Sequence, residues 1–188
     1  MLAVTTGMRR GEILGLRWSD LDLTAGTLAV CQSLEHTRSG GLQFKQPKTR
    51  RSRRVVVLPD VAVEALRKHR AAQGRLRLQA GTDYNDHDLV CARWDGSPRI
   101  PGAVTRAFAK LLTDLGLPKV RFHDLRHSHA TRLLREGIHP KVVSERLGHS
   151  TVGITLDTYS HVTPTMQEEA AKRIDVALRS ALRKRKPN

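Results

Sequence analysis

Segments with the alternating pattern of a β-strand occur only in the first third of this sequence. We predict strands over residues 27–34, over a short segment that ends near Lys45, and over residues 53–58, which contain three consecutive valines. Ser39-Gly40-Gly41 is a turn signal between the first two segments. Three short strands this close in the chain predict one small, three-stranded antiparallel sheet near the N-terminus.

Helical patterns fill the rest of the chain, so the expected fold is a mostly helical α+β domain. Residues 18–22 are expected to form a loop after the first helix. Asp60 is expected to cap the first long helix, directly after Pro59. Gly137 and Gly148 are expected to end the helices that precede them. The expected helices span residues 8–16, 60–73, 101–115, 123–136, 140–147, 151–160 and 164–184.

The charge of the chain indicates a polyanionic partner. Among 188 residues, 33 Lys and Arg outnumber 18 Asp and Glu, which gives a net charge of +15 and a pI near 11.0. Nucleic acid is the commonest such partner. A ribosomal-type protein or a merely basic soluble surface would show the same excess.

Other features of the sequence concern its compartment. It contains no run of eighteen apolar residues, so we expect no membrane span. No basic region precedes its short apolar start, so we expect no signal peptide. Cys31 and Cys91 have neither metal-ligand nor redox spacing, which predicts free, buried thiols in a reducing cytoplasm.

Residues suited to phosphoryl-transfer chemistry lie in five short strings. Arginine forks can hold the non-bridging oxygens of a phosphate and offset charge in the transition state. Lysine and histidine can move protons, and a tyrosine oxygen can become a covalent nucleophile. Together these groups suffice to attack a phosphodiester without a metal. The strings are TTGMRRGE, PKTRRSRR, FHDLRHSHA, RLGHS and TLDTYSH, and the residues are Arg9, Lys48, His123, Arg126, His149 and Tyr159.

Simpler interpretations exist for the arginines and the lysine. Arg9 and Arg10 adjoin Glu12, so an ion pair on a helix surface would account for them. Lys48 lies in a basic run that a solvated, charged hairpin would explain. A hairpin this rich in arginine would also suit a DNA groove or backbone. The other basic residues of the run are Lys45, Arg50, Arg51, Arg53 and Arg54.

The histidines allow a second chemistry. His123 and Arg126 are three residues apart, so on a helix they share a face and can meet one phosphate. His127 lies four residues from His123, which makes a zinc pair the rival interpretation. The sequence has no H-E-x-x-H motif to support it, so we expect no metal site, and we expect His127 and His129 to pack or face solvent.

His149 and Tyr159 have simpler interpretations as well. His149 follows Leu-Gly, where the dipole of a helix would stabilise a terminal histidine. Tyr159 could be an ordinary aromatic residue near a helix end. The other tyrosine, Tyr84, lies in a Gly-Thr-Asp-Tyr-Asn context that predicts a surface loop.

The five strings, in this order, resemble the tyrosine recombinase, or phage integrase, family from Thr6 to about Val162. The resemblance implies the DNA breaking-rejoining enzyme fold and site-specific recombination through a 3′-phosphotyrosyl intermediate, with no cofactor. It places the first catalytic arginine at Arg9, with Glu12 as its supporting carboxylate. It places the hairpin lysine at Lys48, with Lys45 as the reserve.

The remaining site residues also follow from the resemblance. His123 would assist proton transfer, Arg126 would be the second catalytic arginine, and His149 would contact a non-bridging oxygen. Tyr159 would be the nucleophile. Residues assigned to DNA binding are Arg10, Lys45, Arg50, Arg51, Arg53 and Arg54.

The expected partners are double-stranded DNA and further copies of the chain. Residues 1–163 would form the catalytic domain. Residues 164–184 place apolar residues on one face of a helix, and residues 185–188 end the chain in a basic tail. By the resemblance, that helix would be exchanged between protomers in a tetramer on DNA.

One departure from the family pattern concerns the start of the chain. Complete members carry further helices and a separate DNA-clamping domain before the first catalytic arginine, whereas Arg9 lies eight residues after Met1. We therefore expect an N-terminally truncated recombinase. The alternatives are a non-catalytic DNA-binding remnant and a type IB topoisomerase, which uses similar residues to relax DNA.

Overall fold

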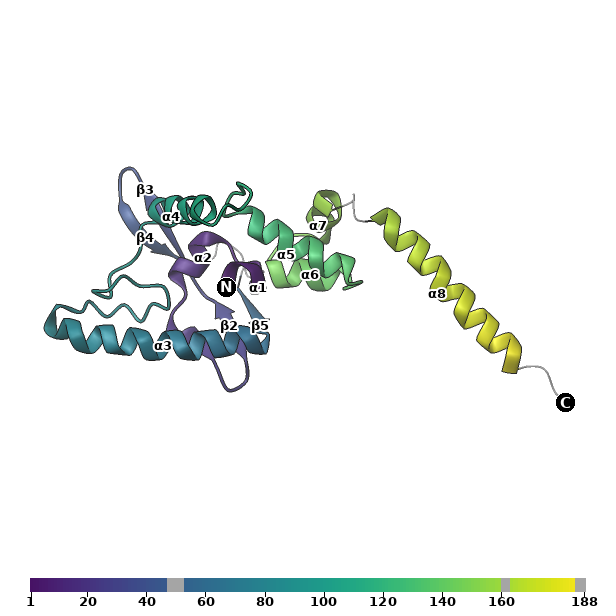
Figure 1. Ribbon diagram of the computed structural model, residues 1–188, viewed down its shortest axis with the longest axis horizontal. Helices are drawn as coiled ribbons and strands as arrows, with labels where there is room; N and C mark the ends of the chain where they lie inside the picture. Colours follow the sequence, from purple (N-terminus) through teal and green to yellow (C-terminus); the bar gives the residue numbers. More distant parts are fainter. Residues whose placement is uncertain (47–52, 160–162, 185–188) are drawn as a thin grey trace.

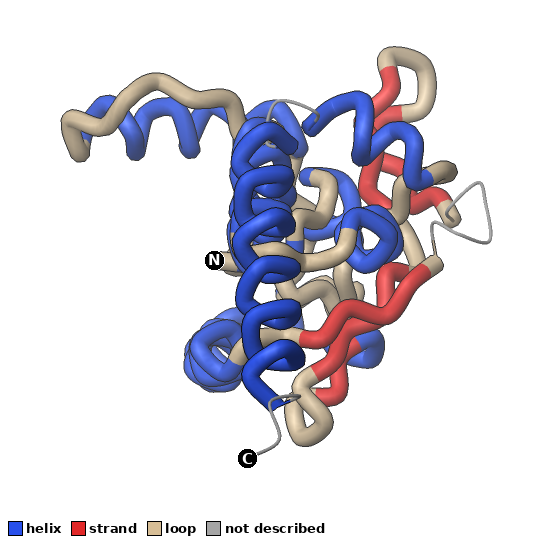
Figure 2. The backbone as a smooth tube through the Cα atoms, turned by 90° about the vertical axis from the view of Figure 1, so that its right-hand side faces the viewer, coloured by secondary structure: helices blue, strands red, loops and turns tan. Residues whose placement is uncertain are grey.

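The computed structural model describes residues 1–46, 53–159 and 163–184. It confirms a mostly helical α+β fold with antiparallel pairing throughout (Figures 1 and 2). The strands are β1 (Leu21–Asp22), β2 (Thr27–Val30), β3 (Ser33–Thr37), β4 (Gly41–Lys45) and β5 (Arg54–Val57). The helices are α1 (Leu2–Thr6), α2 (Arg10–Gly15), α3 (Asp60–Ala80), α4 (Pro101–Asp114), α5 (Asp124–Arg135), α6 (Pro140–Leu147), α7 (Val152–Tyr159) and α8 (Thr163–Lys184).

The strands form two sheets rather than the single predicted one. One has the order β1-β2-β5, and the other is the hairpin β3-β4. The predicted strand over 27–34 divides between them, because β2 pairs with β5 at Leu28↔Val56 whereas β3 pairs with β4. At the break, the side chain of Gln32 donates a hydrogen bond to the Gly15 carbonyl at 2.8 Å.

The core lies between the first sheet and the helices around it. Leu28 and Val56 are 1% exposed, and they belong to the same buried cluster as Met8 of the α1–α2 turn and Ala62 and Leu66 of α3. A second, smaller apolar cluster joins α5 to α6 and includes Leu134 and Leu147. The molecule therefore has two packed parts, and α1 lies beside α5 where they meet.

Most predicted helices agree with the structure within a few residues, and α6 agrees at both ends. The predicted cap of α3 is wrong. Pro59 occupies the N-cap position in an extended conformation, and Asp60 is the first helical residue, where its carboxylate still faces the positive end of the helix dipole. The helix also continues past Gln73 to Ala80, because Gly74 is accommodated within it and the turn falls at Gly81 (φ 55°).

Two expectations about the glycines hold, and two about the start of the chain do not. Gly137 and Gly148 take left-handed conformations after α5 and α6, as predicted. The predicted helix over 8–16 is shorter, and a separate α1 precedes it. Residues 18–22 contain a 3-10 turn and the short strand β1 rather than only a loop. Within the described ranges no helix is both long and apolar enough to cross a membrane.

Candidate active site

Arg9 occupies the N-cap of α2, where the chain turns after Gly7 at φ 65°. Its backbone N–H donates to Glu12 Oε2 at 2.8 Å, and its Nη1 donates to Glu12 Oε1 at 3.0 Å. The side chain of Arg9 is 45% exposed, while that of Glu12 is 7% exposed. The expected pairing of Arg9 with Glu12 therefore exists, and it leaves a tethered guanidinium on the surface.

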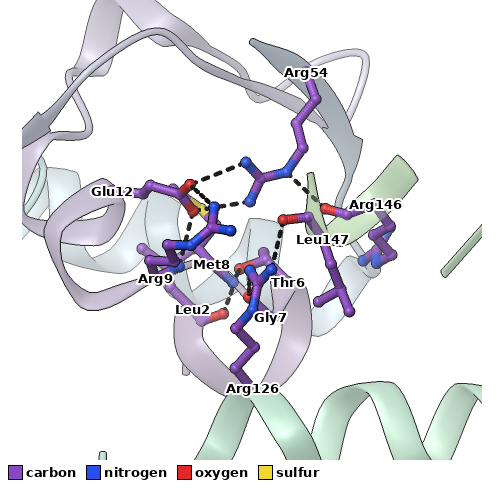
Figure 3. Close-up of polar contacts among 10 residues, drawn as sticks. All are labelled: Leu2, Thr6, Gly7, Met8, Arg9, Glu12, Arg54, Arg126, Arg146 and Leu147. Carbon is purple, nitrogen blue, oxygen red and sulfur yellow. Dashed lines mark hydrogen bonds and ion pairs between the residues drawn. The ribbon is translucent and has the colours of Figure 1, made fainter. Parts of the chain in front are cut away.

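Arg54 contacts the other side of the same carboxylate (Figure 3). Its Nη1 and Nη2 donate to Glu12 Oε1 and Oε2 at 3.1 and 2.8 Å, and its Nε donates to the Arg146 carbonyl at 2.7 Å. Burial by itself raises the pKa of Glu12, but the hydrogen bonds and charges of Arg54 and Arg9 hold that pKa below its usual value. Glu12 is therefore a buried carboxylate that binds two arginines.

The assignment of Arg54 to DNA binding is corrected by this geometry. The Arg54 side chain is 6% exposed and is enclosed by Glu12 and α6, so it does not present a surface charge. Alternation along β5 could have shown this, because Val56 on the same face is 1% exposed whereas Val55 and Val57 on the opposite face are 67% and 63% exposed.

Arg126 joins the first part of the molecule to the second. It lies on α5 and is only 4% exposed. Its Nη1 donates to the Gly7 carbonyl at 2.7 Å, and its Nη2 donates to the Leu147 carbonyl at 2.8 Å (Figure 3). Since Gly7 leads into Arg9 and Leu147 leads into His149, one guanidinium sets the spacing of both segments.

His123 and His127 lie close together at the start of α5, with ring centroids 5.0 Å apart in an edge-to-face arrangement. Partial burial lowers the pKa of His123, and the nearby His127, Arg126 and Arg9 lower it further. Among the described residues, no three histidine, cysteine or carboxylate side chains lie close enough to hold a metal ion. The rival interpretation, a zinc pair at His123 and His127, therefore finds no third ligand among these residues.

His149 follows Gly148, and its backbone N–H donates to the Ser144 carbonyl at 3.0 Å. Its Nδ1 lies 2.8 Å from the hydroxyl of Thr155, which is fully buried. Burial, together with the positive charges of Arg126, Arg9 and Arg54, lowers the pKa of His149 to about 4. His149 is therefore a neutral imidazole held beside the arginines. Thr155 begins the string TLDTYSH, but no sequence signal assigns it a contact with His149.

Arg146 on α6 makes hydrogen bonds to α1, α5 and β5, and no sequence pattern predicted them. Arg146 donates through Nη2 to the Thr5 carbonyl at 2.8 Å and through Nη1 to the Val57 carbonyl at 2.9 Å. Its Nε donates to His129 Nε2 at 3.1 Å, so His129 donates from Nδ1 to the Val4 carbonyl at 2.8 Å. Burial lowers the pKa of His129. His129 therefore packs between elements in its neutral form.

The structure describes the basic run between β4 and β5, and Tyr159, only in part. Lys48, Arg50 and Arg51 lie outside the described residues. Tyr159 is the last residue of α7, ten residues after His149, and its side chain also lies outside them. The roles of Lys48 and Tyr159 therefore stay predictions.

A cleft of about 670 Å³ is lined by residues of α2, the hairpin β3-β4 and the start of α4, among them Arg9, Arg10 and Lys45. Lys45 pairs with Glu35 at 2.8 Å at an exposed position. Arg10 donates to the Thr105 hydroxyl on α4. Arg53 is exposed and donates to Gln46. Arg9, Arg10 and Lys45 therefore present positive charge to one open cleft.

The contact between His149 and Thr155 gives a testable expectation. Replacing Thr155 with valine keeps the shape but removes the hydroxyl, so the ring loses the hydrogen bond that orients it. Since a hydrogen bond of this kind is worth about 1 kcal/mol, we expect any cleavage of a phosphodiester at this site to slow by roughly fivefold. Single-turnover kinetics measure this, and Thr155→Ser is the matched control that keeps the hydroxyl. Equal rates for valine and serine would contradict the assignment.

The lowered pKa of His149 predicts how stability varies with pH. The unfolded chain binds a proton near pH 6.5, whereas the folded chain binds one only near pH 4. The contribution of His149 to the free energy of unfolding is therefore fully present above pH 6.5. It is lost progressively as the pH falls from 6.5 to about 4. Denaturant unfolding from pH 7 to 4 checks this, and we expect His149→Gln to make the fall in unfolding free energy shallower. An unchanged pH slope would show that His149 titrates normally.

Comparison with known proteins agrees with the fold. The model of the phage integrase family matches residues 1–166. The chain therefore belongs to the phage integrase family.

Curated relatives and solved structures extend this result. The chain is 34% identical to a XerC-like tyrosine recombinase of Caldanaerobacter subterraneus subsp. tengcongensis, over 93% of this chain and 48% of that protein. It is 32% identical to the ICEBs1 integrase of Bacillus subtilis, over 93% and 47%. The chain spans about half the length of these curated relatives.

Among solved structures, the chain shares its fold with the Tn1549 transposon integrase in complex with transposon right end DNA. The TM-score is 0.79 and the sequence identity is 22%, and the match covers 93% of this chain and 57% of that one. The XerA recombinase matches with a TM-score of 0.63 and 26% identity, over 100% and 56%.

Proposed function

We propose that this chain is the catalytic domain of a site-specific DNA recombinase that breaks and rejoins DNA through a 3′-phosphotyrosyl intermediate. One observation carries the proposal: Arg9 and Arg126 are held by carboxylate and carbonyl partners beside a neutral His149. Arginines and a neutral imidazole donor are the groups that stabilise the charge of a phosphate under attack. The catalytic set also includes His123, Lys48 and Tyr159.

In the first step, the oxygen of Tyr159 attacks the scissile phosphorus. A tyrosine hydroxyl has a pKa of about 10, so it must lose its proton as the bond forms. His123, whose pKa is lowered, is neutral at pH 7 and can accept that proton. Arg9 and Arg126 offset the charge of the pentacoordinate phosphorus. Nδ1 of His149 lies 2.8 Å from the Thr155 hydroxyl, and in the tautomer that accepts a hydrogen bond there, His149 donates from Nε2 to a non-bridging oxygen.

In the second half of the step, the bond from phosphorus to the 5′ oxygen breaks. Lys48 supplies a proton to that oxygen, which leaves as a 5′ hydroxyl. The phosphotyrosyl ester keeps the energy of the original ester. The 5′ hydroxyl of a partner strand can therefore attack it and release Tyr159, and no nucleotide cofactor is consumed.

The partner in this proposal is double-stranded DNA. The net charge of +15 suits it, and the XerH recombinase among the solved neighbours is bound to its difH DNA substrate. Because DNA is the substrate, the chain would act in the cytoplasm. Contacts to the DNA backbone would come from Arg10, Lys45, Arg50, Arg51 and Arg53.

The C-terminal helix supports an oligomer. Figure 1 shows α8 apart from the other helices, and Ile174, Leu178 and Leu182 on it are 61%, 58% and 66% exposed. Apolar residues this exposed need a partner to cover them. The proposal therefore divides the chain into a catalytic domain, 1–163, and a C-terminal segment, 164–188, that docks on another copy in a tetramer on DNA.

A covalent-capture experiment tests the proposed function. The chain is mixed with a pool of nicked DNA duplexes whose central sequence is randomised, so that cleavage releases a short fragment and traps the intermediate. A band of retarded protein on a denaturing gel, removed by nuclease, is the expected result. DNA binding without any adduct would support the non-catalytic alternative. Relaxation of supercoiled plasmid without strand exchange would support the topoisomerase alternative.

We expect the adduct to form equally well with and without divalent metal. The proposed site holds the phosphate with arginines, so it needs no metal to neutralise charge. The measurement compares adduct yield in excess chelator with the yield in magnesium or zinc. Complete loss in chelator, restored by zinc, would instead favour a metal bound at His123 and His127.

A further inference from the structure

The position of Arg54 has a consequence for the site. It lies on β5, and its guanidinium reaches the carboxylate of Glu12 on α2 and the carbonyl of Arg146 on α6. Three elements that are distant in sequence therefore meet on one planar group (Figure 3). Glu12 in turn holds Arg9 at 3.0 Å, and Arg146 lies three residues before His149.

The turn before His149 lies in close contact with the side chain of Arg54. Gly148 has a φ of 69°, which favours glycine. A Cβ placed there would lie 2.8 Å from Nη1 of Arg54, 3.1 Å from its Cδ and 3.2 Å from its Cζ. The contact between Arg54 and the turn is therefore close along most of the side chain.

We propose that Arg54 is a positioning residue for strand cleavage, which sets Arg9 through Glu12 and sets the turn that carries His149 through the Arg146 carbonyl. The proposal rests on the proposed function, because it concerns the rate of that reaction. Arg54 itself is assigned no contact with DNA, because all three of its guanidinium nitrogens donate to Glu12 or to the Arg146 carbonyl. Its effect is on geometry, and a misplacement of about 1 Å in a catalytic group can cost roughly 100-fold in rate.

The test separates positioning from simple stabilisation. Arg54→Lys keeps the charge beside Glu12 but cannot form the fork and the Nε contact together. We expect this variant to bind DNA within about twofold of wild type and to cleave saturating nicked duplex roughly 100-fold more slowly. Arg17→Lys is the matched control: Arg17 also forks onto a carboxylate, Asp20, at 2.9 and 2.8 Å, but outside the site. Its cleavage rate should be unchanged.

A second variant tests the proposal if Arg54→Lys does not fold. If thermal unfolding shows that Arg54→Lys is unfolded at the assay temperature, Glu12→Gln/Arg54→Gln removes both buried charges together and avoids an unpaired one. We expect this double variant to be folded and still slow. Wild-type cleavage at saturating DNA by either folded variant would overturn the proposal.

A readout independent of cleavage keeps the two proposals distinct. In NMR spectra of the free protein, we expect Arg54→Lys to displace or broaden the ring signals of His149, and Arg17→Lys to leave them in place. Unchanged His149 signals in Arg54→Lys would overturn the positioning role. If Arg54→Lys displaces the His149 signals but the wild-type chain forms no adduct, the positioning geometry is supported and the proposed function is rejected.

Discussion

We expect the Tyr159→Phe variant to bind DNA as tightly as the wild-type chain and to form no covalent adduct. The substitution removes a single oxygen, which is the atom proposed to attack the phosphorus. The aromatic ring remains, so the substitution changes no other atom of the chain. Gel shift with the nicked pool measures binding, and a denaturing gel of the same samples measures the adduct. The loss should be complete, because no other group on the proposed path can form the ester.

The matched control for this variant is Tyr84→Phe. The Tyr84 hydroxyl accepts a hydrogen bond from Gln73 at 3.3 Å, and the Arg77 guanidinium lies over its ring, so it has a local structural role. We expect its adduct yield to equal that of wild type. An adduct that persists in Tyr159→Phe, or one attached to Tyr84, would contradict the assignment of the nucleophile.

The second large effect is expected at Arg126. Arg126→Lys removes a fork that spans the carbonyls of Gly7 and Leu147 and that would also hold the phosphate in the transition state. We expect single-turnover cleavage to fall by roughly 10²–10³-fold, which is about 3–4 kcal/mol of transition-state stabilisation. Thermal unfolding of the same variant is needed, because its buried carbonyl partners also lose hydrogen bonds.

Arg53, which is exposed and lies directly before β5, provides the contrast. We expect Arg53→Gln to weaken binding to DNA of any sequence and to reduce the slope of affinity against salt by about one. Its rate at saturating DNA should exceed that of Arg126→Lys by far. If both variants bound normally and lost cleavage equally, the division between catalytic and binding arginines would be wrong.

Much of the fold could be predicted from local patterns. The helices of the second half have apolar periodicities, and glycines follow α4, α5 and α6, so α4, α5, α6 and α7 were predicted within a few residues. The short helix α1 has no such signal in five residues. The separation of β2 from β3 depends on pairing with strands elsewhere in the chain, which a local pattern does not contain.

In the site too, local spacings could be predicted from the sequence, whereas contacts between distant elements could not. The spacing of Arg9 to Glu12 and of His123 to Arg126 falls within single turns, so the sequence was informative about both pairs. Arg54 was misassigned because it stands in a basic run, and only its strand alternation distinguishes it from exposed Arg53. Thr155 was missed because its contact with His149 spans a turn and has no sequence motif.

The most direct test of the central claim is the chemical identity of the trapped complex. The adduct formed with the nicked pool is digested with trypsin and nuclease, and mass spectrometry locates the residual nucleotide. We predict a nucleotide joined through its 3′ phosphate to Tyr159, with a free 5′ hydroxyl on the released strand. A nucleotide on another residue, a 5′ phosphate linkage, or no covalent nucleotide despite DNA binding would contradict the account.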